Sequence, residues 1–387
     1  MSPTQHPILP GRGMLLAGCA AALTFLAGCA QTGPSAPMAA APRAGGAAQL
    51  QEVARFDHQV TGVTVSPAGR VFVNFPRWSD DAPVSVAEVM LDGTTRAFPN
   101  AEWNAWRNAR KDQMTAADHF VCVQSVVVDH QGFLWALDAA APAQGPVVPM
   151  GPKLVKIDLA SNQVVKTIAF DEKIAPNGSY LNDVRFSPDG RTGYITDSGA
   201  KGAIVVVDLV QGSARRVLDG DPSTQVDKTV NVKADGQVLR RPDGRGVEFS
   251  ADGIALSADG AMLYWQAIKG KTLYRVPTRA LTDMAAQSRL PSMVEKVGDN
   301  GPVDGILFGR DGRLFLTSPE DDSVKVRDAA GSVRMLVQSP SLRWPDTLSQ
   351  APDGSVYVTS SRIQDMSWYK PSSPASLPTT LFKIVNP

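Results

Sequence analysis

The most regular feature of the sequence is a pair of short apolar stretches joined by a polar turn, which occurs six times. In each copy a polar residue leads an alternating apolar stretch, and a glycine follows eight positions later. Alternation with a period of two, interrupted by a turn rich in Pro, Asp and Gly, is typical of a β-hairpin. The six leading residues are Thr61, Gln124, Asn182, Asp252, Asp304 and Asp346, and the turn glycines are Gly69, Gly132, Gly190, Gly260, Gly312 and Gly354.

The spacing of these hairpins predicts an all-β fold, a six-bladed β-propeller in which each blade has four strands. Further alternating stretches supply the outer strands of the blades. We expect residues 51–56 to pair with 380–385, because ring closure removes edge strands that would otherwise aggregate. The outer-strand candidates are 153–159 with 164–170, 203–209 with 214–219, and 272–277 and 323–328. Residues 101–118 and 277–290 break the pattern and are interpreted as short helices on loops or as irregular loops.

The N-terminal segment has the pattern of an export signal. Arg12 precedes an apolar run over residues 14–28, and the segment ending at Cys29 (LAGC) resembles a bacterial lipobox. We therefore predict a lipoprotein signal peptide over 1–29 with lipidation of Cys29, a flexible Ala/Pro/Gly tether over 30–48, and the propeller over 49–387. The resemblance implies a protein anchored to the cell envelope through its lipid, at the outer membrane, or secreted. A simple cleaved signal peptide or a single membrane anchor is the alternative.

Composition, charge and short motifs argue against several classes of function. Lys plus Arg and Asp plus Glu both number 38, so the basic excess of a nucleic-acid-binding protein is missing. The four histidines form no HExxH pattern, and we find no GxSxG, Walker or GxGxxG motif. Cys122 lies in an apolar stretch and is interpreted as a buried structural thiol. We expect a monomeric domain whose partner is a small molecule.

Seven segments in order resemble the major royal jelly protein/Yellow family and span nearly all of the predicted propeller. One difference is Ala139-Ala140, where the family usually has a glycine. The matching segments are VFVNFPRW (71–78), FLWALD (133–138), PKLVKIDL (152–159), YITDSGAKGAIVVVDL (194–209), GIALS (253–257), LYRVPTRALTD (273–283) and RWPDTLSQAPDGSVYVTSSR (343–362).

The resemblance implies a six-bladed propeller, in agreement with the repeat count, but it does not fix one activity. Some insect members are implicated as dopachrome-converting enzymes, salivary members bind biogenic amines, and the royal jelly proteins are largely nutritive. Function therefore has to be argued from the site.

The leading residues are the first candidates for a site. In a propeller the first strand of each blade lines the central channel, so the leading residues form a ring at one channel mouth. Five of the six carry a side-chain carbonyl or carboxylate oxygen. Three acids in one small space repel each other unless a cation or protons intervene, and this composition suits Ca²⁺ or Mg²⁺. The alternative is that these residues cap turns by accepting from backbone N–H groups. Asp183 is interpreted as a turn residue.

A second resemblance, to the gluconolactonase/regucalcin propellers, concerns a metal. Those enzymes hold one divalent cation with Glu, Asn and Asp on blade-leading strands. Asn182 and Asp252 match the Asn and the Asp, Asp304 is a substitute ligand, and the Glu position falls on Thr61. The resemblance implies a divalent cation (Ca, Mg or Zn), with Asp252 and Asp304 as catalytic residues. Thr61 puts both metal affinity and lactone hydrolysis in doubt.

Ligand binding without a metal is the other reading of the ring. An amine would be held by aromatic faces and a carboxylate, and a dopachrome-like carboxylate by Arg77 or Arg245. The candidate ligand-binding residues are Gln124, Asn182, Asp346, Arg77 and Trp344. Trp78, Trp135, Trp265 and Trp344 are nevertheless read first as packing residues, and Arg77 is read first as a structural residue. Three hypotheses stay open: a Yellow-type protein that binds a small aromatic or amine ligand, with or without dopachrome-tautomerase-like activity; a metal-dependent lactonase; and a non-catalytic envelope scaffold.

Overall fold

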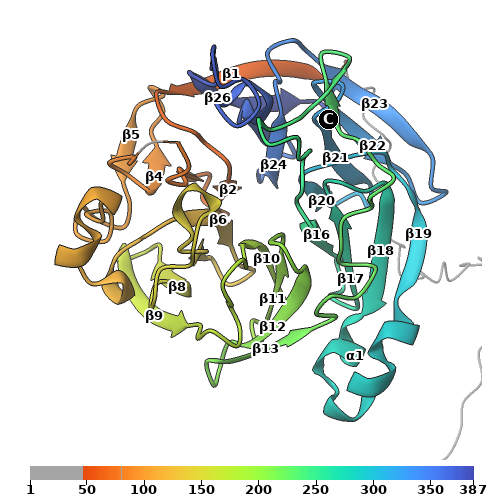
Figure 1. The fold of residues 1–387 in the computed structure, drawn as a ribbon, viewed down its shortest axis with the longest axis horizontal. Helices are drawn as coiled ribbons and strands as arrows, with labels where there is room; N and C mark the ends of the chain where they lie inside the picture. Colours follow the sequence, from red (N-terminus) through yellow and green to blue (C-terminus); the bar gives the residue numbers. More distant parts are fainter. Residues whose placement is uncertain (1–46, 80) are drawn as a thin grey trace, which may run out of the picture. The chain divides into compact units, whose positions relative to one another are not determined.

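Six antiparallel sheets of four strands each surround a central channel, which confirms the six-bladed β-propeller (Figure 1). The computed structural model describes residues 47–79 and 81–387. The first strand of each sheet lies innermost, and the innermost strands of neighbouring sheets contact one another. The six hairpins found in the sequence are therefore the inner halves of the six blades.

The strands run from the channel outward in chain order, except in the blade that closes the ring. The first blade contains β2 (Val63–Val65), β3 (Val71–Asn74), β4 (Val86–Val89) and β5 (Thr95–Ala97). The second contains β6 (Val123–Val128), β7 (Phe133–Asp138), β8 (Lys153–Asp158) and β9 (Gln163–Ala169). The third contains β10 (Leu181–Phe186), β11 (Thr192–Asp197), β12 (Ala203–Asp208) and β13 (Ser213–Val217).

The remaining blades follow the same plan. The fourth contains β16 (Ala251–Leu256), β17 (Met262–Ala267), β18 (Thr272–Pro277) and β19 (Glu295–Asp299). The fifth contains β20 (Ile306–Phe308), β21 (Leu314–Ser318), β22 (Ser323–Arg327) and β23 (Val333–Gln338). The sixth contains β24 (Pro345–Gln350), β25 (Val356–Ser360), β26 (Thr379–Val385) and, as its outer strand, β1 (Gln49–Phe56).

The two ends of the propeller close the ring in one sheet, as the sequence predicted. Strand β1 pairs antiparallel with β26, with Gln49 opposite Val385 and Phe56 opposite Thr379. Figure 1 shows the two strands side by side in the same blade. The pairing gives the last blade a fourth strand and covers the edge that β26 would otherwise expose.

The six turn glycines have the backbone conformation that the hairpins require. Their φ angles lie between 68° (Gly190) and 88° (Gly354), in the left-handed region that glycine enters without steric cost. Each glycine follows the first strand of its blade and lets the chain reverse into the second. The regular spacing between leading residue and glycine therefore reflects one turn geometry used six times.

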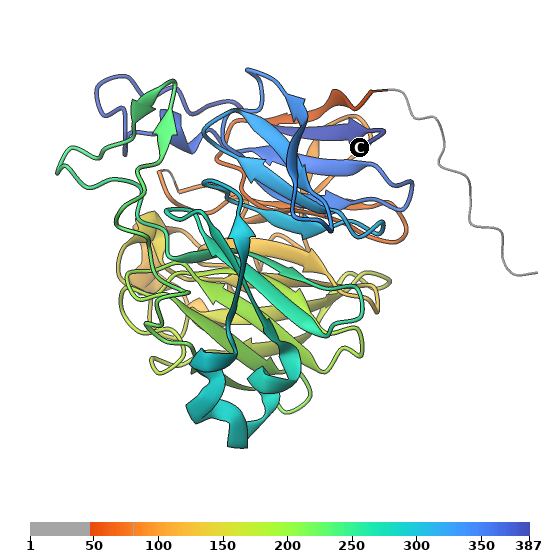
Figure 2. The same cartoon turned by 90° about the vertical axis from the view of Figure 1, so that its right-hand side faces the viewer.

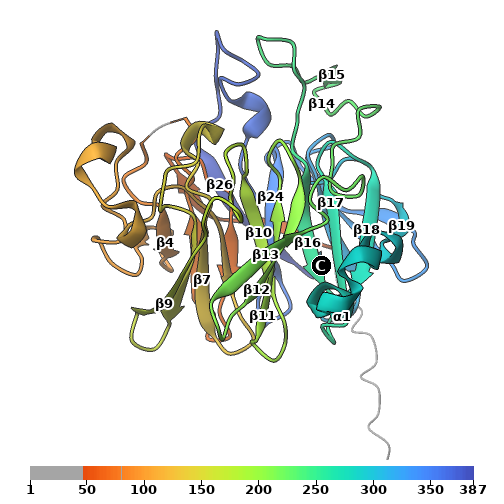
Figure 3. The same cartoon turned by 60° about the horizontal axis from the view of Figure 1, so that its bottom comes forward.

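Two expectations about loops are also met. Residues 101–118 carry 3₁₀ turns at Asn108–Gln113 and Ala116–Asp118, and the second stretch contains α1 (Thr278–Thr282) and a 3₁₀ turn at Met284–Met293. A small separate hairpin, β14 (Lys233–Ala234) with β15 (Gln237–Val238), belongs to none of the blades. Figure 2 and Figure 3 show that this hairpin projects from one end of the propeller.

The core is built between the blades and within them. Trp135 stacks on Phe186 of the next blade with ring centroids 5.1 Å apart, and Trp265 stacks on Tyr274 of the neighbouring strand in its own blade at 6.2 Å. Both indoles are buried, so the packing interpretation of these two tryptophans is confirmed. Cys122 is fully buried and burial raises the pKa of its thiol to about 12, which confirms the inert structural thiol.

The predicted export features lie outside the described residues. This holds for the signal segment with Cys29 and for the tether except Ala47 and Ala48. Within residues 47–79 and 81–387, no helix has the length and apolar character needed to cross a membrane. Lipidation of Cys29 therefore stays a prediction.

Candidate functional site

Local irregularities in the inner strands aim the leading residues at the channel mouth. In four blades the ladder between the first and second strands shifts register at the leading residue, as between Leu181 and Val184 or between Ala251 and Gly253. A bulge of this kind turns a side chain away from the regular alternation. In the other two blades the strand begins only after Thr61 or Asp304. The side chains of the leading residues therefore do not follow the regular alternation of side-chain direction in the strands that come after them.

Glycines let leading residues of neighbouring blades approach closely. A Cβ atom on Gly253 would lie 2.2 Å from the carbonyl oxygen of Asp304, and one on Gly305 would lie 2.2 Å from that of Asp346. No larger residue fits at either position without moving the backbone. The Asp-Gly pairs that recur in the sequence are therefore needed for the close packing of the fourth, fifth and sixth blades around the mouth.

Threonine hydroxyls fix the backbone of the ring. Thr196 donates to the carbonyl oxygen of Asp252 at 2.6 Å, and Thr317 donates to that of Asp346 at 3.0 Å. Thr359 does the same for Thr61 at 2.6 Å. In each case the second strand of one blade holds the leading residue of the next, so the ring is rigid before any ligand binds.

Five of the six leading residues line one small cavity at this mouth. It has about 10 Å³ open to the centre of a water molecule, which is room for about one water or ammonium-sized group. The leading residues supply most of its polar lining, and most of the other lining residues are apolar or aromatic. The lining residues are Trp78, Gln124, Gln144, Tyr180, Asn182, Ser198, Phe249, Asp252, Ile268, Asp304, Asp346 and Ile363.

The three aspartates of the cavity bond to side chains, not to backbone N–H groups. The amide of Asn182 donates to Asp252 at 2.5 Å, and the indole N–H of Trp344 donates to Asp304 at 2.6 Å. Among the described residues, the side-chain bonds found for Asp346 involve the hydroxyls of Thr347 and Ser361. The turn-capping alternative therefore does not describe these three residues.

Two other aspartates do accept hydrogen bonds from backbone N–H groups, as the capping alternative requires. Asp138 accepts from the N–H groups of Val121, Cys122 and Ala140 at 2.7–2.9 Å. Asp197 accepts from those of Tyr180 and Gly199. These two aspartates end the second strands of their blades, and each holds the segment that leads into the neighbouring first strand.

Burial and mutual repulsion favour the protonated form of the aspartates in the cavity. Burial raises the pKa of Asp304 to about 7. Burial, and next the charge of Asp304, raise the pKa of Asp252 and of Asp346 well above the usual range. No Lys or Arg is among the residues that line this cavity. The site is therefore a group of carboxyl groups that share protons and that a cation would ionise.

A hydrogen-bonded aromatic group also lines the cavity. The indole N–H of Trp78 donates to the Tyr180 hydroxyl at 2.5 Å, and this hydroxyl donates to the Gln124 side chain at 2.9 Å. Ser198 is buried and lines the same cavity, and its hydroxyl has no hydrogen-bond partner among residues 47–79 and 81–387. A buried hydroxyl without a partner costs free energy, which a bound ligand would recover. The cavity thus has a carboxyl side, an aromatic side and one unused hydroxyl.

Two sequence candidates do not line the cavity, and Arg77 requires a correction. Its guanidinium is buried and donates to the carbonyl oxygens of Ala82, Phe120 and Val121 at 2.6–3.1 Å. It holds the loop before β6 and is not available to a ligand. Trp344 is buried behind the ring and contacts the site through its bond to Asp304.

Asp183 and Thr61 also differ from expectation. Asp183 lies within β10 and not in a turn, and it accepts from Ser125 at 2.7 Å and pairs with Arg185 at 2.8 Å. Thr61 lies outside the cavity. Its hydroxyl donates to the carbonyl oxygen of Gln124 and accepts from Asn74, so it joins two blades.

The cavity does not have the form of a metal site. In residues 47–79 and 81–387, no group of three or more His, Cys, Asp or Glu side chains is arranged to hold a metal ion. Asn182 points its NH₂ group at Asp252, where a ligand would point its oxygen. Thr61 supplies no carboxylate. The metal role of Asn182, Asp252 and Asp304 stays a prediction, and these side chains would have to rearrange to fulfil it.

Residues 121–373 match the family model described as "Major royal jelly protein". The chain belongs to this family. No curated protein sequence matches it significantly. The family assignment agrees with the motifs quoted from the sequence, most of which lie within the matched range.

Solved structures of other six-bladed propellers are similar in fold. A gluconolactonase from Xanthomonas campestris is 15% identical over 87% of this chain and 89% of its own, with a TM-score of 0.50. The calcium-binding protein regucalcin from Agrobacterium tumefaciens is 16% identical over 86% and 95%, with a TM-score of 0.52. A luciferin-regenerating enzyme is 8% identical over 87% and 95%, with a TM-score of 0.54. At these identities the likeness shows the fold alone.

Several residues of the cavity were missed from the sequence. Tyr180 and Ser198 gave a weak signal, because Tyr180 stands two residues before a leading residue and Ser198 ends the Thr-Asp-Ser motif. Phe249, Ile268 and Ile363 gave none. They come from loops far apart in the chain, and only the closed ring brings them together.

Proposed function

We propose that this member of the major royal jelly protein family binds a small cationic amine that carries an aromatic ring, at the mouth of its channel. The observation that carries the proposal is the cavity that Asp252, Asp304 and Asp346 line together with Trp78 and Tyr180, with no Lys or Arg among its lining residues. An ammonium group would pair with the carboxylates and contact the aromatic faces.

The chemistry of the cavity favours a cation over an anion. A dopachrome-like substrate carries a carboxylate, which the aspartates would repel. Arg77 is occupied by backbone carbonyls, and Arg245 is exposed and paired with Asp243. A tautomerase-like activity is therefore the weaker form of the proposal. In that form Asp304 would move the proton, because its pKa of about 7 suits a general acid or base at neutral pH.

Calorimetric titration with 2-phenylethylamine tests the proposal, with 2-phenylethanol and phenylacetate as matched neutral and anionic ligands. We expect the amine to bind about tenfold to a hundredfold more tightly than the alcohol, because a charge-assisted bond to a buried carboxylate replaces a neutral one. Affinity should rise with pH up to about 7 and then level off, since an ionised Asp304 is needed. Binding should release protons.

Asp304→Asn is expected to weaken amine binding by about tenfold or more and to change the pH profile, because the titration of Asp304 is lost while Asp252 and Asp346 remain. The control is Asp353→Asn, an exposed carboxylate paired with Lys383, which should leave binding unchanged. Equal binding of amine and alcohol, or a pH profile that is the same in Asp304→Asn, would contradict the proposal. Absence of binding to all three ligands would favour the scaffold hypothesis.

Elemental analysis tests the metal-dependent alternative. We expect protein purified without chelator to contain no stoichiometric Ca²⁺, Mg²⁺ or Zn²⁺, because Thr61 and the amide of Asn182 do not complete a set of oxygen ligands. Samples before and after EDTA dialysis should give the same amine affinity. One tightly bound metal per chain, lost together with hydrolysis of a lactone after EDTA treatment, would replace the amine proposal by the lactonase hypothesis.

A further inference from the structure

Part of the cavity wall comes from a segment that belongs to no blade. Residues 226–249, which we call the lid, include the β14–β15 hairpin and end at Phe249 in the cavity wall. The hairpin forms a separate two-stranded sheet. It lies at the same end of the propeller as the loop after β25 in two views of the molecule (Figure 2, Figure 3). The lid adds no strand to a blade, but two of its backbone N–H groups bond to blade loops: that of Asp227 donates to the carbonyl oxygen of Lys269 at 2.7 Å, and that of Lys233 donates to the carboxylate of Glu320 at 2.8 Å.

Apolar side chains of the lid pack into the core, and the cavity that the lid lines is small. Val232, Leu239 and Phe249 are buried in one cluster with Trp344 and Ile363. With room for about one water-sized group, the cavity accepts an ammonium group but not the aromatic ring attached to it. A ligand larger than a single ion therefore requires the cover to move.

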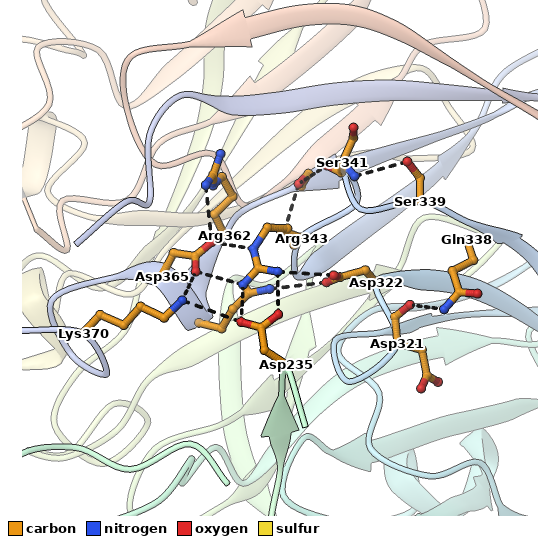
Figure 4. Close-up of polar contacts among 12 residues, drawn as sticks. Asp235, Asp321, Asp322, Gln338, Ser339, Ser341, Arg343, Arg362, Asp365 and Lys370 are labelled. Carbon is orange, nitrogen blue, oxygen red and sulfur yellow. Dashed lines mark hydrogen bonds and ion pairs between the residues drawn. The ribbon is translucent and has the colours of Figure 1, made fainter. Parts of the chain in front are cut away.

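One ion-pair network joins the tip of the lid to the ring (Figure 4). The guanidinium of Arg343 donates to both oxygens of Asp235, which lies at the tip, at 2.9 Å. It also donates to Asp365 at 2.6 and 2.9 Å. Lys370 bonds Asp365 at 2.5 Å and lies 3.7 Å from Asp235. Arg343 is followed by Trp344, which holds Asp304, so the network is one residue away from the carboxyl side of the cavity.

The two halves of this network differ in exposure. The side chain of Asp365 is 3% exposed, whereas that of Asp235 is 54% exposed. Ion pairs that face water are weak and are screened by salt, whereas buried pairs are screened much less. The Asp235 half is therefore the part that separates, while Asp365 keeps Arg343 in place.

A second contact holds the base of the lid. Arg241 donates to Gln144 at 3.2 Å and lies over the ring of Trp368, 5.0 Å from its centroid. Trp368 in turn packs on Trp78 of the cavity wall at 5.2 Å. Release of Asp235 would leave the lid attached at this end, so that it opens about its base.

We propose that residues 226–249 are a gate over the carboxyl cavity and that the pairs of Asp235 with Arg343 and Lys370 are its latch. The gate would control entry of a ligand to the cavity, and this role rests on the proposed function. Its movement is a property of the protein without ligand, and it is tested without one.

Thiol labelling measures opening directly. Ser198→Cys in a chain that also carries Cys19→Ser and Cys29→Ser puts a thiol in the cavity at a hydroxyl that makes no hydrogen bond. Cys122 is the internal reference, because it lies deeper, behind the Tyr180 hydroxyl at 3.9 Å. Iodoacetamide modification of the two peptides is followed by mass spectrometry. We expect Asp235→Asn to raise the rate at position 198 by about threefold to tenfold and to leave that of Cys122 unchanged.

Salt gives the same test without changing the lid. Raising NaCl from 20 mM to 500 mM should speed labelling at position 198 in the chain with Asp235 and have little effect in Asp235→Asn. The matched control Asp353→Asn should behave like the chain with Asp235 intact. Parallel acceleration at both thiols would mean general unfolding and overturn the gate, as would rates that respond to neither salt nor Asp235→Asn. Failure of amine binding would not affect this result.

Discussion

Asp138→Ala is expected to lower the free energy of unfolding by about 3–5 kcal/mol, the largest effect of any single substitution considered for this protein. The carboxylate is fully buried and accepts from the ammonium of Lys153 at 2.9 Å. Without it Lys153, which is 1% exposed, keeps only the carbonyl oxygens of Ala116 and Gly151. A buried charge without its partner is strongly destabilising. Urea denaturation at pH 7 measures the loss.

Companion variants separate the ion pair from the backbone cap. Asp138→Asn keeps an oxygen for the N–H groups of Val121 and Cys122 but removes the charge, so it should cost less than alanine. Adding Lys153→Met to Asp138→Ala should recover part of the loss, because no unpaired charge remains. Asp158→Ala, at the end of β8 in the same blade, where the half-buried carboxylate accepts from the following turn, should cost about 1 kcal/mol or less. Equal effects at Asp138 and Asp158 would contradict the argument.

The buried pair also connects stability with the site. Asp138 accepts hydrogen bonds from the backbone N–H groups of Val121 and Cys122. Two residues after Cys122, the side chain of Gln124 accepts a hydrogen bond from the Tyr180 hydroxyl in the cavity. Loss of the pair should therefore also loosen the aromatic wall. The Leu-Trp-Ala-Leu-Asp motif, read from the sequence only as a family resemblance, has a physical role in positioning this wall.

The fold could be predicted from the sequence because its signals are local. Each leading residue and its turn glycine stand eight positions apart, and one hairpin geometry explains that spacing six times. Pairing of residues 51–56 with 380–385 followed from the need to close the ring, and β1 and β26 confirm it. The ring of carboxyl and amide side chains followed from the repeat as well, since equivalent positions of six blades meet at the channel.

The rest of the site depends on contacts that no local pattern contains. Arg77 looked available to a ligand because its acceptors are carbonyl oxygens from loops up to 44 positions away. Asp183 looked like a turn residue because a bulge interrupts the strand alternation just there. The lid gave no signal at all, because its latch joins Asp235 to Arg343, 108 positions later.

The second large effect is a stability that falls as pH rises. The pKa of Asp304 is about 7 in the folded protein, against an ordinary value near 3.8. Between these two values the folded state binds the proton more tightly than the unfolded state. This stabilisation is complete below the unfolded pKa and is lost as pH rises through the folded one, at a cost on the order of 4 kcal/mol for this one group. Urea denaturation from pH 4 to pH 8 measures it.

Asp304→Asn should remove most of this slope and make the protein more stable than the parent at pH 8, because its amide needs no proton and still accepts from Trp344. The control Asp353→Asn has the opposite sign: hydrogen bonds from Lys383 and Ser355 lower the pKa of Asp353 to about 2, so its small contribution at this exposed site is present at neutral pH and is lost only in acid, as pH falls from about 4 to about 2. A parent protein equally stable at pH 5 and pH 8 would refute the shared-proton description.

The other outcome is that Asp304→Asn gains stability and loses amine binding. In that case the buried carboxyl group destabilises the fold but is needed for binding, as is common for residues in binding sites. An ammonium ligand would then stabilise the parent most at pH 8, where it neutralises the carboxylates that otherwise repel each other.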